Sequence, residues 1–591
     1  MRDKREKYKI FTRRALITGA VKATLLSCLI GRFYYLQILT SDEYKTLSNK
    51  NRLRIFLTQP KRGQILDGNG VALAENIKTY ALLLKREYKT QIKTVVAKIN
   101  DIMVDQKVNI SLIPSKNKGI SHIQPIKLFE NLSLQNAILL DANPELIETE
   151  IKESFIRYYP LKEKAFHITG YLGSTNKTDV KEGDVKKQYD FAVGKDGVEK
   201  QFNEDLTGQP GMEKIEVDAK GNFIRSVDFS SSVPGNDIKL SINNNVQNIL
   251  CNHMHGYTGA IVVMDLTIQK IIGLVSSPTI NPNIFIEGLS HDDWKTIKTN
   301  KQNPLINKCI SAKYPPGSIF KLVMFLAILK QGLDPEHRIF CPGYHKVGNT
   351  VYGCWKKSGH GYMNLENALA QSCNVYFFEQ SLKVGINRIY EIANLLGLSQ
   401  KTNIELPFEM TGLIPTKEWK KRRYKLNWYP GDTINTSIGQ GYVETTPIQL
   451  LQMTARIAAK KNLSSSIITS KLDEAMVDNL NVNHQHLVKL RAALLKVFYD
   501  PNGTGYNERI EDPEYQIAGK SGTSQVVGTK HNSKNALYQD NSLFVGFAPF
   551  HNPRFVISTV IENGGWGSKT ATPISKNILL DIKALNLPVI N

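Results

Sequence analysis

The first long apolar run of the chain extends from Ala15 to Leu39, and it follows fourteen residues that hold seven basic and two acidic side chains. About 20 helical residues cross the apolar part of a bilayer. Lys22 and Arg32 interrupt the run, but each side chain is long enough to reach toward an interface. The pattern predicts a cytoplasmic tail (1–14), an uncleaved single-pass anchor (15–39) and an exported body. A cleaved signal peptide and an amphipathic soluble helix are the alternatives.

Short strand-like runs separated by turn residues follow the anchor. Between Asn51 and Asn76, one proline and three glycines punctuate these runs, which is typical of extended, turn-rich β structure. Residues 86–187 mix basic helical stretches with loops and hold no recognisable catalytic constellation. The Gly-rich, polar segment from Gly194 to Gly211 is interpreted as structural. Residues 40–235 are therefore predicted to form one β-rich region with a supporting role.

Longer periodic elements begin near residue 236. The pattern predicts two strands in Thr258–Asn283, followed by helices over Ser318–Leu329 and Asn364–Leu382. It then predicts strands over Tyr515–Ala518, Ser542–Ala548 and Arg554–Glu562, and a last helix over Thr572–Leu585. This order favours an α+β fold in which helices cover an antiparallel sheet, over 236–591.

Composition narrows the possible classes of protein. The 591 residues are 41% hydrophobic and 22% charged, which excludes a wholly disordered, collagen-like or polytopic membrane protein. The net charge of +21 points to an anionic neighbour or to a lysine-rich composition alone. The sequence holds no zinc finger or RNA-binding signature, so nucleic acid is not predicted as a partner.

The segment from Tyr314 to Lys321 is the first candidate for chemistry. Two prolines and a glycine force a turn, so Ser318 is expected at a helix N-terminus with Lys321 one turn later on the same face. A neutral lysine can take the proton of a serine nucleophile, and the helix start favours a developing oxyanion. An ordinary N-cap serine is the competing interpretation.

Two further motifs strengthen this candidate. Ser372-Cys373-Asn374 begins 54 residues after Ser318, in a helical region. Lys520-Ser521-Gly522-Thr523 begins 202 residues after Ser318 and follows a strand-like segment. On a strand this motif supplies a cation, hydroxyls and a close backbone approach to an extended peptide. Three motifs in this order together indicate a serine acyltransferase.

A cluster of thiols and one imidazole overlaps the second motif. Cys341, Cys354, His360 and Cys373 have the spacing Cys-x12-Cys-x5-His-x12-Cys. Three thiolates and an imidazole suit a tetrahedral, structural Zn²⁺ with no open position. A disulfide with one free thiol is the alternative in an oxidising compartment.

The three motifs resemble those of the penicillin-recognising serine acyltransferases, and the whole chain resembles a class B penicillin-binding protein. The segments Asn427–Thr433, Cys354–Gly361 and Ile561–Gly565 are most similar to penicillin-binding protein 2, the elongation-specific group. The resemblance implies a pedestal over 40–235 and a transpeptidase domain over 236–591. It also implies a zinc site in the cysteine segment. One departure is that Asp67-Gly68-Asn69-Gly70 lacks the arginine common in the class.

The resemblance also implies roles. Ser318 is acylated by a D-Ala-D-Ala stem peptide or by penicillin, Lys321 is the base, and Ser372 and Asn374 relay a proton and hold the substrate amide. Lys520, Ser521, Gly522 and Thr523 bind the substrate carboxylate. No organic cofactor is expected. The implied partners are peptidoglycan stem peptides, β-lactams and a SEDS-type glycosyltransferase of the elongation complex, with the enzyme in the bacterial inner membrane and its catalytic domain in the periplasm. A β-lactamase and a catalytically idle scaffold are the competing functions.

Overall fold

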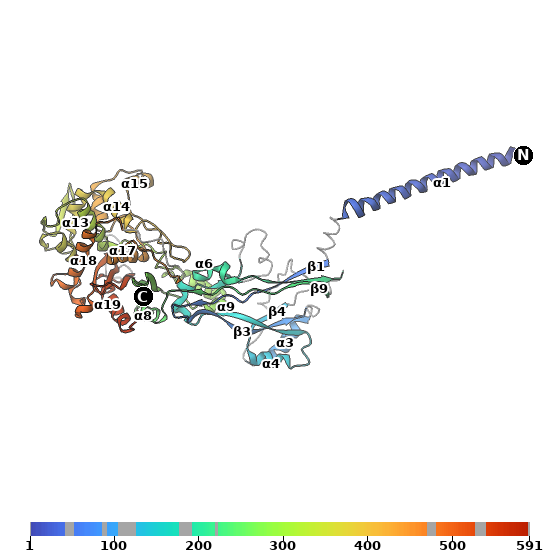
Figure 1. Cartoon of the computed structure of the whole chain (residues 1–591), viewed down its shortest axis with the longest axis horizontal. Helices are drawn as coiled ribbons and strands as arrows, with labels where there is room; N and C mark the ends of the chain where they lie inside the picture. Colours follow the sequence, from blue (N-terminus) through green and yellow to red (C-terminus); the bar gives the residue numbers. More distant parts are fainter. Residues whose placement is uncertain are drawn as a thin grey trace. The chain divides into compact units, whose positions relative to one another are not determined.

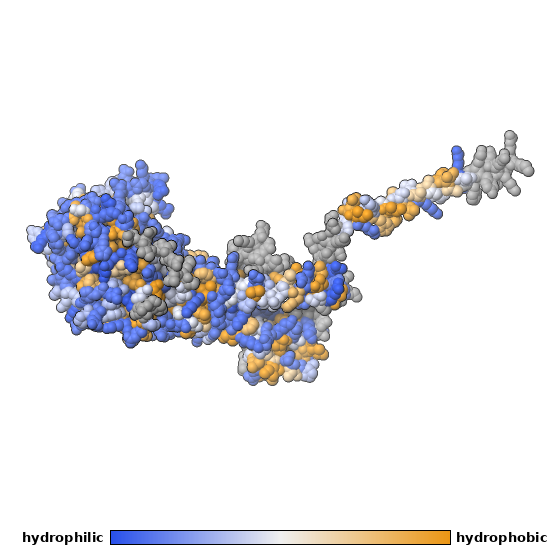
Figure 2. Space-filling view, in the orientation of Figure 1, coloured by the Kyte–Doolittle hydropathy of each residue, from blue (hydrophilic) through white to orange (hydrophobic). Residues whose placement is uncertain are grey.

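The computed structural model describes residues 2–41, 52–85, 91–104, 126–175, 192–218, 223–469, 480–525 and 539–588. Helix α1 (Arg2–Tyr34) continues into a π-helical turn (Tyr35–Leu39). Within the described ranges, Thr12–Leu39 is the single helical stretch with the length and hydropathy to cross a membrane. Its apolar side chains are exposed, as the hydrophobic colouring of α1 in Figure 2 shows. A single-pass anchor is therefore the simplest environment for this helix.

The chain divides into two compact units, and the smaller comprises residues 1–61, 78–155 and 208–234. It contains an antiparallel three-stranded sheet of β1 (Leu53–Thr58), β8 (Gly211–Val217) and β9 (Phe223–Ser230). The second half of β3 (Ala72–Leu84) pairs with β4 (Ile126–Leu132). Helices α3 (Ile92–Ile102) and α4 (Leu134–Asp141) complete a core around Leu82, Ile99 and Leu140 (Figure 1).

The larger unit is built on a five-stranded antiparallel sheet of order β12-β11-β19-β18-β17. Its strands are β11 (Gly259–Asp265), β12 (Lys270–Ser277), β17 (Ala518–Ser524), β18 (Asn541–Ala548) and β19 (Phe555–Ile561). Alternate residues of β11 enter two different cores. Ile261 and Val263 pack in the core that includes helices α8 (Asn244–Met254) and α19 (Ala571–Ala584). Val262 packs in the core that includes α11 (Lys321–Lys330) and α17 (Pro447–Ala459). Helices thus cover both faces, as predicted.

One predicted strand is wrong in position. The segment predicted as a strand over Tyr515–Ala518 begins with a 3-10 turn (Pro513–Tyr515), because Asp512 caps the Glu514 N–H and Pro513 occupies the first position of the turn. Strand β17 starts only at Ala518. The Lys520 motif therefore lies inside the strand and does not follow it.

The larger unit also includes residues 62–77 and 156–207, which precede residue 236 in the chain. Strand β2 (Ile65–Leu66) pairs in parallel with β10 (Ile238–Lys239). Glu199 is fully buried and binds two arginines, Arg62 Nε at 2.6 Å and Arg157 Nε at 2.7 Å. Although burial opposes its charge, the two guanidinium groups hold the pKa of Glu199 below its usual value. Glu199, in the polar segment predicted to be structural, thus holds two arginines inside this unit.

Candidate active site

Ser318 lies in a tight turn between two elements of the larger unit. It belongs to a 3-10 turn (Gly317–Phe320) that leads directly into α11, in which nine of the ten residues are buried. Gly317 has φ +55°, and a Cβ there would lie 2.5 Å from the Thr523 carbonyl oxygen. Only glycine fits this approach. The turn therefore presses the serine against strand β17.

Lys321 is completely buried and occupies the centre of the site. Its Nζ donates to the Ser372 carbonyl oxygen at 2.8 Å, to Ser372 Oγ at 3.2 Å and to Asn374 Oδ1 at 2.7 Å. Ser372 Oγ in turn lies 3.0 Å from Ser318 Oγ. The four side chains form a continuous hydrogen-bond chain in which Ser372 connects the serine to the amine.

The environment of Lys321 favours its neutral form. Burial lowers the pKa of Lys321 to about 8, although the nearby thiols of Cys354, Cys373 and Cys341 oppose this change. Lys520 is also fully buried, and burial together with the charge of Lys321 holds the pKa of Lys520 well below its usual value. Two buried amines near one another cannot both carry a charge at low cost.

Strand β17 places the third motif at the edge of the sheet, beside the serine turn. A Cβ on Gly522 would lie 2.6 Å from the Pro316 carbonyl oxygen, so the strand and the turn meet backbone to backbone. Lys520 is buried, whereas Ser521 and Thr523 are partly exposed. The arrangement presents hydroxyls beside a buried amine, along an edge to which an extended peptide can add.

The second motif sits on a strained backbone that the thiol cluster holds. Ser372 has φ +55°, an uncommon value for serine, and helix α13 (Asn374–Val384) starts two residues later. The Asn374 N–H donates to Cys354 Sγ at 3.3 Å. Trp355 Nε1 donates to the Ser372 carbonyl oxygen at 3.1 Å. Trp355 was not singled out in the sequence, and its position next to Cys354 was the available signal.

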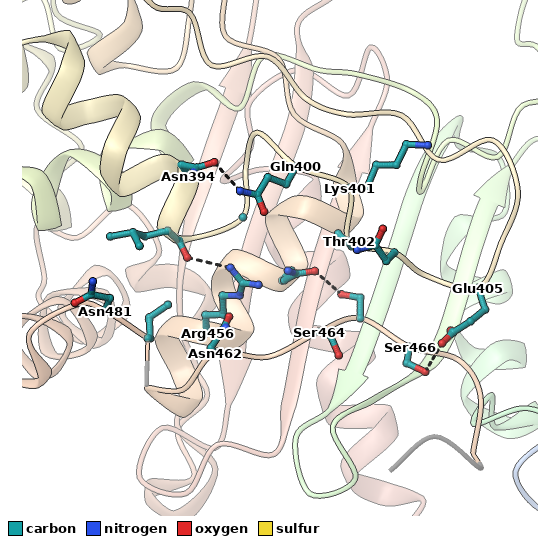
Figure 3. A pocket seen from close by; sticks show the side chains of 16 residues that line it. Asn394, Gln400, Lys401, Thr402, Glu405, Arg456, Asn462, Ser464, Ser466 and Asn481 are labelled. Atoms are coloured by element: carbon teal, nitrogen blue, oxygen red, sulfur yellow. Dashed lines mark hydrogen bonds between the residues drawn. The ribbon is translucent and has the colours of Figure 1, made fainter. Parts of the chain in front are cut away.

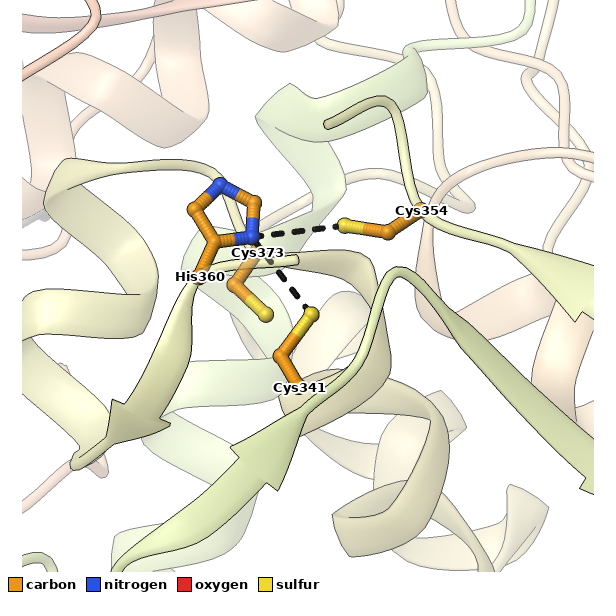
Figure 4. A group of neighbouring side chains, drawn as sticks. All are labelled: Cys341, Cys354, His360 and Cys373. Carbon is orange, nitrogen blue, oxygen red and sulfur yellow. Dashed lines mark hydrogen bonds between the residues drawn. The ribbon is translucent and has the colours of Figure 1, made fainter. Parts of the chain in front are cut away.

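The four predicted metal ligands converge on one point (Figure 4). Their ligand atoms all lie within 4.8 Å of one another, and His360 Nδ1 is 3.5 Å from both Cys341 Sγ and Cys354 Sγ. Zinc bonds of about 2.0 and 2.3 Å place tetrahedral ligand atoms roughly 3.5–3.8 Å apart. All six cysteines of the chain are free thiols, so the alternative of a disulfide is not adopted. The donor set and its spacing fit a tetrahedral thiophilic ion.

Hydrogen bonds prepare one of these thiols for metal binding. The Cys373 thiol, together with His360 and the Asn374 N–H, lowers the pKa of the Cys354 thiol against the opposing effect of burial. A thiolate is the form that binds zinc. Because Cys373 lies between Ser372 and Asn374, the cluster and the catalytic residues share one loop.

A polar cavity of about 560 Å³ lies elsewhere in the larger unit (Figure 3). Arg456, Gln400, Thr402 and Ser466 are among its lining residues, and none of the motif residues is. Arg456 donates to the carbonyl oxygens of Leu395 and Leu463, so it holds the end of α14 (Ile386–Leu395). The cavity is separate from the catalytic cluster.

Comparison with known proteins defines the class. Residues 259–580 match the penicillin binding protein transpeptidase domain, and residues 57–240 match the penicillin-binding protein dimerisation domain. The chain therefore belongs to the penicillin-binding protein transpeptidases, as its motifs predicted.

Several relatives are peptidoglycan D,D-transpeptidases named MrdA or structures of PBP2. Peptidoglycan D,D-transpeptidase MrdA of Acinetobacter baumannii is 34% identical over 97% of this chain and 88% of its own length. The structure of PBP2 from Helicobacter pylori in complex with MreC has a TM-score of 0.80 at 27% identity, covering 90% of this chain and 99% of that one. Pseudomonas aeruginosa PBP2 in complex with WCK 5153 has a TM-score of 0.68 at 28% identity, covering 90% and 96%. The predicted similarity to the penicillin-binding protein 2 group is confirmed.

Proposed function

We propose that this transpeptidase cross-links peptidoglycan by acylating Ser318 with a stem peptide that ends in D-Ala-D-Ala, during cell elongation. The observation that carries the proposal is the hydrogen-bond chain from Ser318 Oγ through Ser372 Oγ to the buried Lys321 Nζ. The name of the A. baumannii relative supports the substrate class. Penicillin acylates the same oxygen, because its lactam carbonyl replaces the carbonyl of the penultimate D-Ala.

The contacts define a route for the proton. With Lys321 neutral, the Ser318 hydroxyl gives its proton to Ser372 Oγ while the Ser372 proton passes to Lys321 Nζ. Ser318 Oγ attacks the substrate carbonyl, the peptide bond to the last D-Ala breaks, and the leaving amine takes the proton back through Ser372. An amine of a neighbouring strand then attacks the ester, which forms the cross-link and frees Ser318.

Strand β17 and the turn before α11 position the substrate. The stem peptide adds to the edge of β17, its terminal carboxylate facing Lys520, Ser521, Gly522 and Thr523. Asn374 Oδ1 accepts from Lys321, and one hydrogen of its amide group donates to the Gly353 carbonyl oxygen at 3.3 Å. The second amide hydrogen holds the substrate. The backbone N–H groups of Ser318 and Thr523 serve as the oxyanion hole.

Cys341, Cys354, His360 and Cys373 hold a structural Zn²⁺ in this proposal. The convergence of their four ligand atoms, all within 4.8 Å of one another, supports it. Bound zinc supplies no chemistry to the reacting atoms, because four protein ligands close its coordination. Its effect on catalysis is to fix the loop that carries Ser372 and Asn374.

The remaining assignments concern location and partners. Residues 1–14 lie in the cytoplasm, 15–39 cross the inner membrane, 40–235 form the pedestal and 236–591 carry out catalysis in the periplasm. The basic flank of α1 supports this orientation. Elongation-complex membrane proteins are the expected partners, since the H. pylori relative was solved with MreC. A SEDS-type glycosyltransferase is the expected source of glycan strands.

Fluorescent penicillin tests the function. The full chain should form a stable adduct that maps to Ser318 by mass spectrometry, and Ser318→Ala should abolish it. Ser311→Ala is a matched control, because its hydroxyl only donates to the Phe408 carbonyl oxygen. Rapid loss of the label would indicate a β-lactamase, and failure of the wild type to label would indicate a scaffold. Either result contradicts the proposal.

A further inference from the structure

An exposed basic surface lies on helix α15 (Lys417–Tyr424) and the residue after it. Positions 421–425 hold four cations, Lys421, Arg422, Arg423 and Lys425, around Tyr424, and all five side chains are exposed. Among described residues, no carboxylate pairs with Lys421, Arg423 or Lys425. Figure 2 shows a strongly hydrophilic surface over the position of α15 in Figure 1. Arg422 acts on the Glu418 carboxyl of the same helix, whereas the exposed charges of Lys421, Arg423 and Lys425 are available to a partner.

The helix beneath this surface is rigidly attached. Lys420 is only 3% exposed, and its Nζ lies 2.5 Å from Asp432 Oδ2. The same ammonium lies 5.0 Å from the ring centre of Tyr429 and 5.8 Å from that of Tyr442. The Tyr424 ring stacks on Tyr442 at 5.3 Å. Charge and aromatic rings are therefore presented in fixed positions.

Helix α16 and the residues after it connect α15 to the turn that carries Ser318. Helix α16 (Pro430–Ser437) starts next to Tyr429, and just past its end the Gly439 carbonyl oxygen accepts from the Gly317 N–H at 3.0 Å. Gln440 Nε2 donates to the Thr523 carbonyl oxygen at 3.3 Å. Eight helical residues extend about 12 Å. An extended peptide of five residues spans about 17 Å, which is longer than α16.

We propose that α15, together with Tyr424 and Tyr429, is an exosite that binds the carboxylate-bearing part of an uncross-linked peptidoglycan strand while its stem peptide reacts at Ser318. The inference rests on the proposed function and adds a second contact for the same substrate. The cations face stem-peptide carboxylates, and the exposed rings of Tyr424 and Tyr429, 46% and 56% exposed, offer flat faces to sugars. Exposed ion pairs are individually weak, but repeated charges on one polymer act together and are screened by salt.

The test compares two triple variants of the full-length chain in detergent. Lys421→Gln/Arg422→Gln/Arg423→Gln removes three charges from the exosite. Lys295→Gln/Lys298→Gln/Lys301→Gln removes three exposed charges at α10 (His291–Thr299) and is the matched control. Substrates are glycan strands bearing pentapeptide stems, free pentapeptide, and fluorescent penicillin.

In the exosite variant, kcat/KM for the strands should fall about five- to twentyfold at low salt, mainly through KM, and the difference should shrink at high salt. The rate with penicillin, which carries no stem peptide, should stay within about twofold, and free pentapeptide, which offers the carboxylates of one stem only, should lose less than the strands. Strand kinetics equal to those of the α10 control would overturn the exosite. So would an equal loss with penicillin, or a loss confined to binding of anionic lipid vesicles. Failure of the wild type to label or cross-link would instead refute the proposed function itself, and the exosite with it.

Discussion

Replacing Lys321 with methionine removes one amine from the centre of the catalytic cluster and keeps a side chain of similar length. Three acceptors then lose a donor: the Ser372 carbonyl oxygen, Ser372 Oγ and Asn374 Oδ1. The first still accepts from Trp355 Nε1. The methionine side chain does not carry the free-energy cost of burying an amine, and this offsets part of the stability lost with the three hydrogen bonds. The free energy of unfolding should therefore change by no more than about 2 kcal/mol.

Acylation should respond far more strongly than stability. A positioned general base contributes about 10²–10⁴-fold, which corresponds to roughly 2.7–5.4 kcal/mol of activation free energy. The measurement is the second-order rate constant of Ser318 acylation by fluorescent penicillin, with a thermal unfolding curve on the same sample. The rate constant should fall at least a hundredfold while the melting temperature moves by a few degrees.

A second buried lysine supplies the control. Lys308 is 3% exposed, and its Nζ donates to the Gln302 carbonyl oxygen at 2.7 Å, outside the catalytic cluster. Lys308→Met should acylate at the wild-type rate. If Lys321→Met acylates within tenfold of the wild type, the proton does not pass to this amine and the proposed route is refuted.

Three other predictions follow from the same structure. Purified protein should hold close to one zinc per chain, and Cys373→Ser should lower zinc content and melting temperature; metal analysis that finds none removes the site. Glu199→Gln should cost about 3–5 kcal/mol in urea unfolding, because two buried arginines lose their counter-charge, and a cost below 1 kcal/mol would contradict this. Burial raises the pKa of Asp196 to about 6, so its contribution to stability is present below about pH 4 and lost as pH rises through 6. Asp196→Asn should therefore gain up to about 3 kcal/mol relative to wild type between pH 4 and 7.5, and a constant difference across this range would refute the assignment.

Single helices and strands of the transpeptidase unit could be predicted because the residues that specify each of them lie within or next to that element. The two strands in Thr258–Asn283 and the helix after Ser318 follow from apolar runs and turn residues. The strand over Tyr515–Ala518 was misplaced, because aromatic and β-branched composition outweighed the cap at Asp512. A single capping side chain decides where such an element begins, and amino-acid composition alone does not predict that starting residue.

Contacts between distant motifs were beyond local reasoning. Ser318 and Ser372 are 54 residues apart, and their 3.0 Å contact was expected only through a family resemblance. The pairing of Lys420 with Asp432, which attaches α15 to α16, was not predicted at all. Nothing in the spacing of Trp355 indicates that its indole supports the Ser372 carbonyl oxygen. Such contacts depend on the assembled sheet and not on the segments that make them.

The parallel pairing of β2 with β10 has a consequence for biogenesis. Ile65 leaves the ribosome 173 residues before its partner Ile238. At about 5–20 residues per second, roughly 10–35 s pass before the pairing is possible. A nascent chain that stalls before Ile238 therefore lacks the strand that completes the parallel pairing of β2, and this interval ends before Ser318 has been translated.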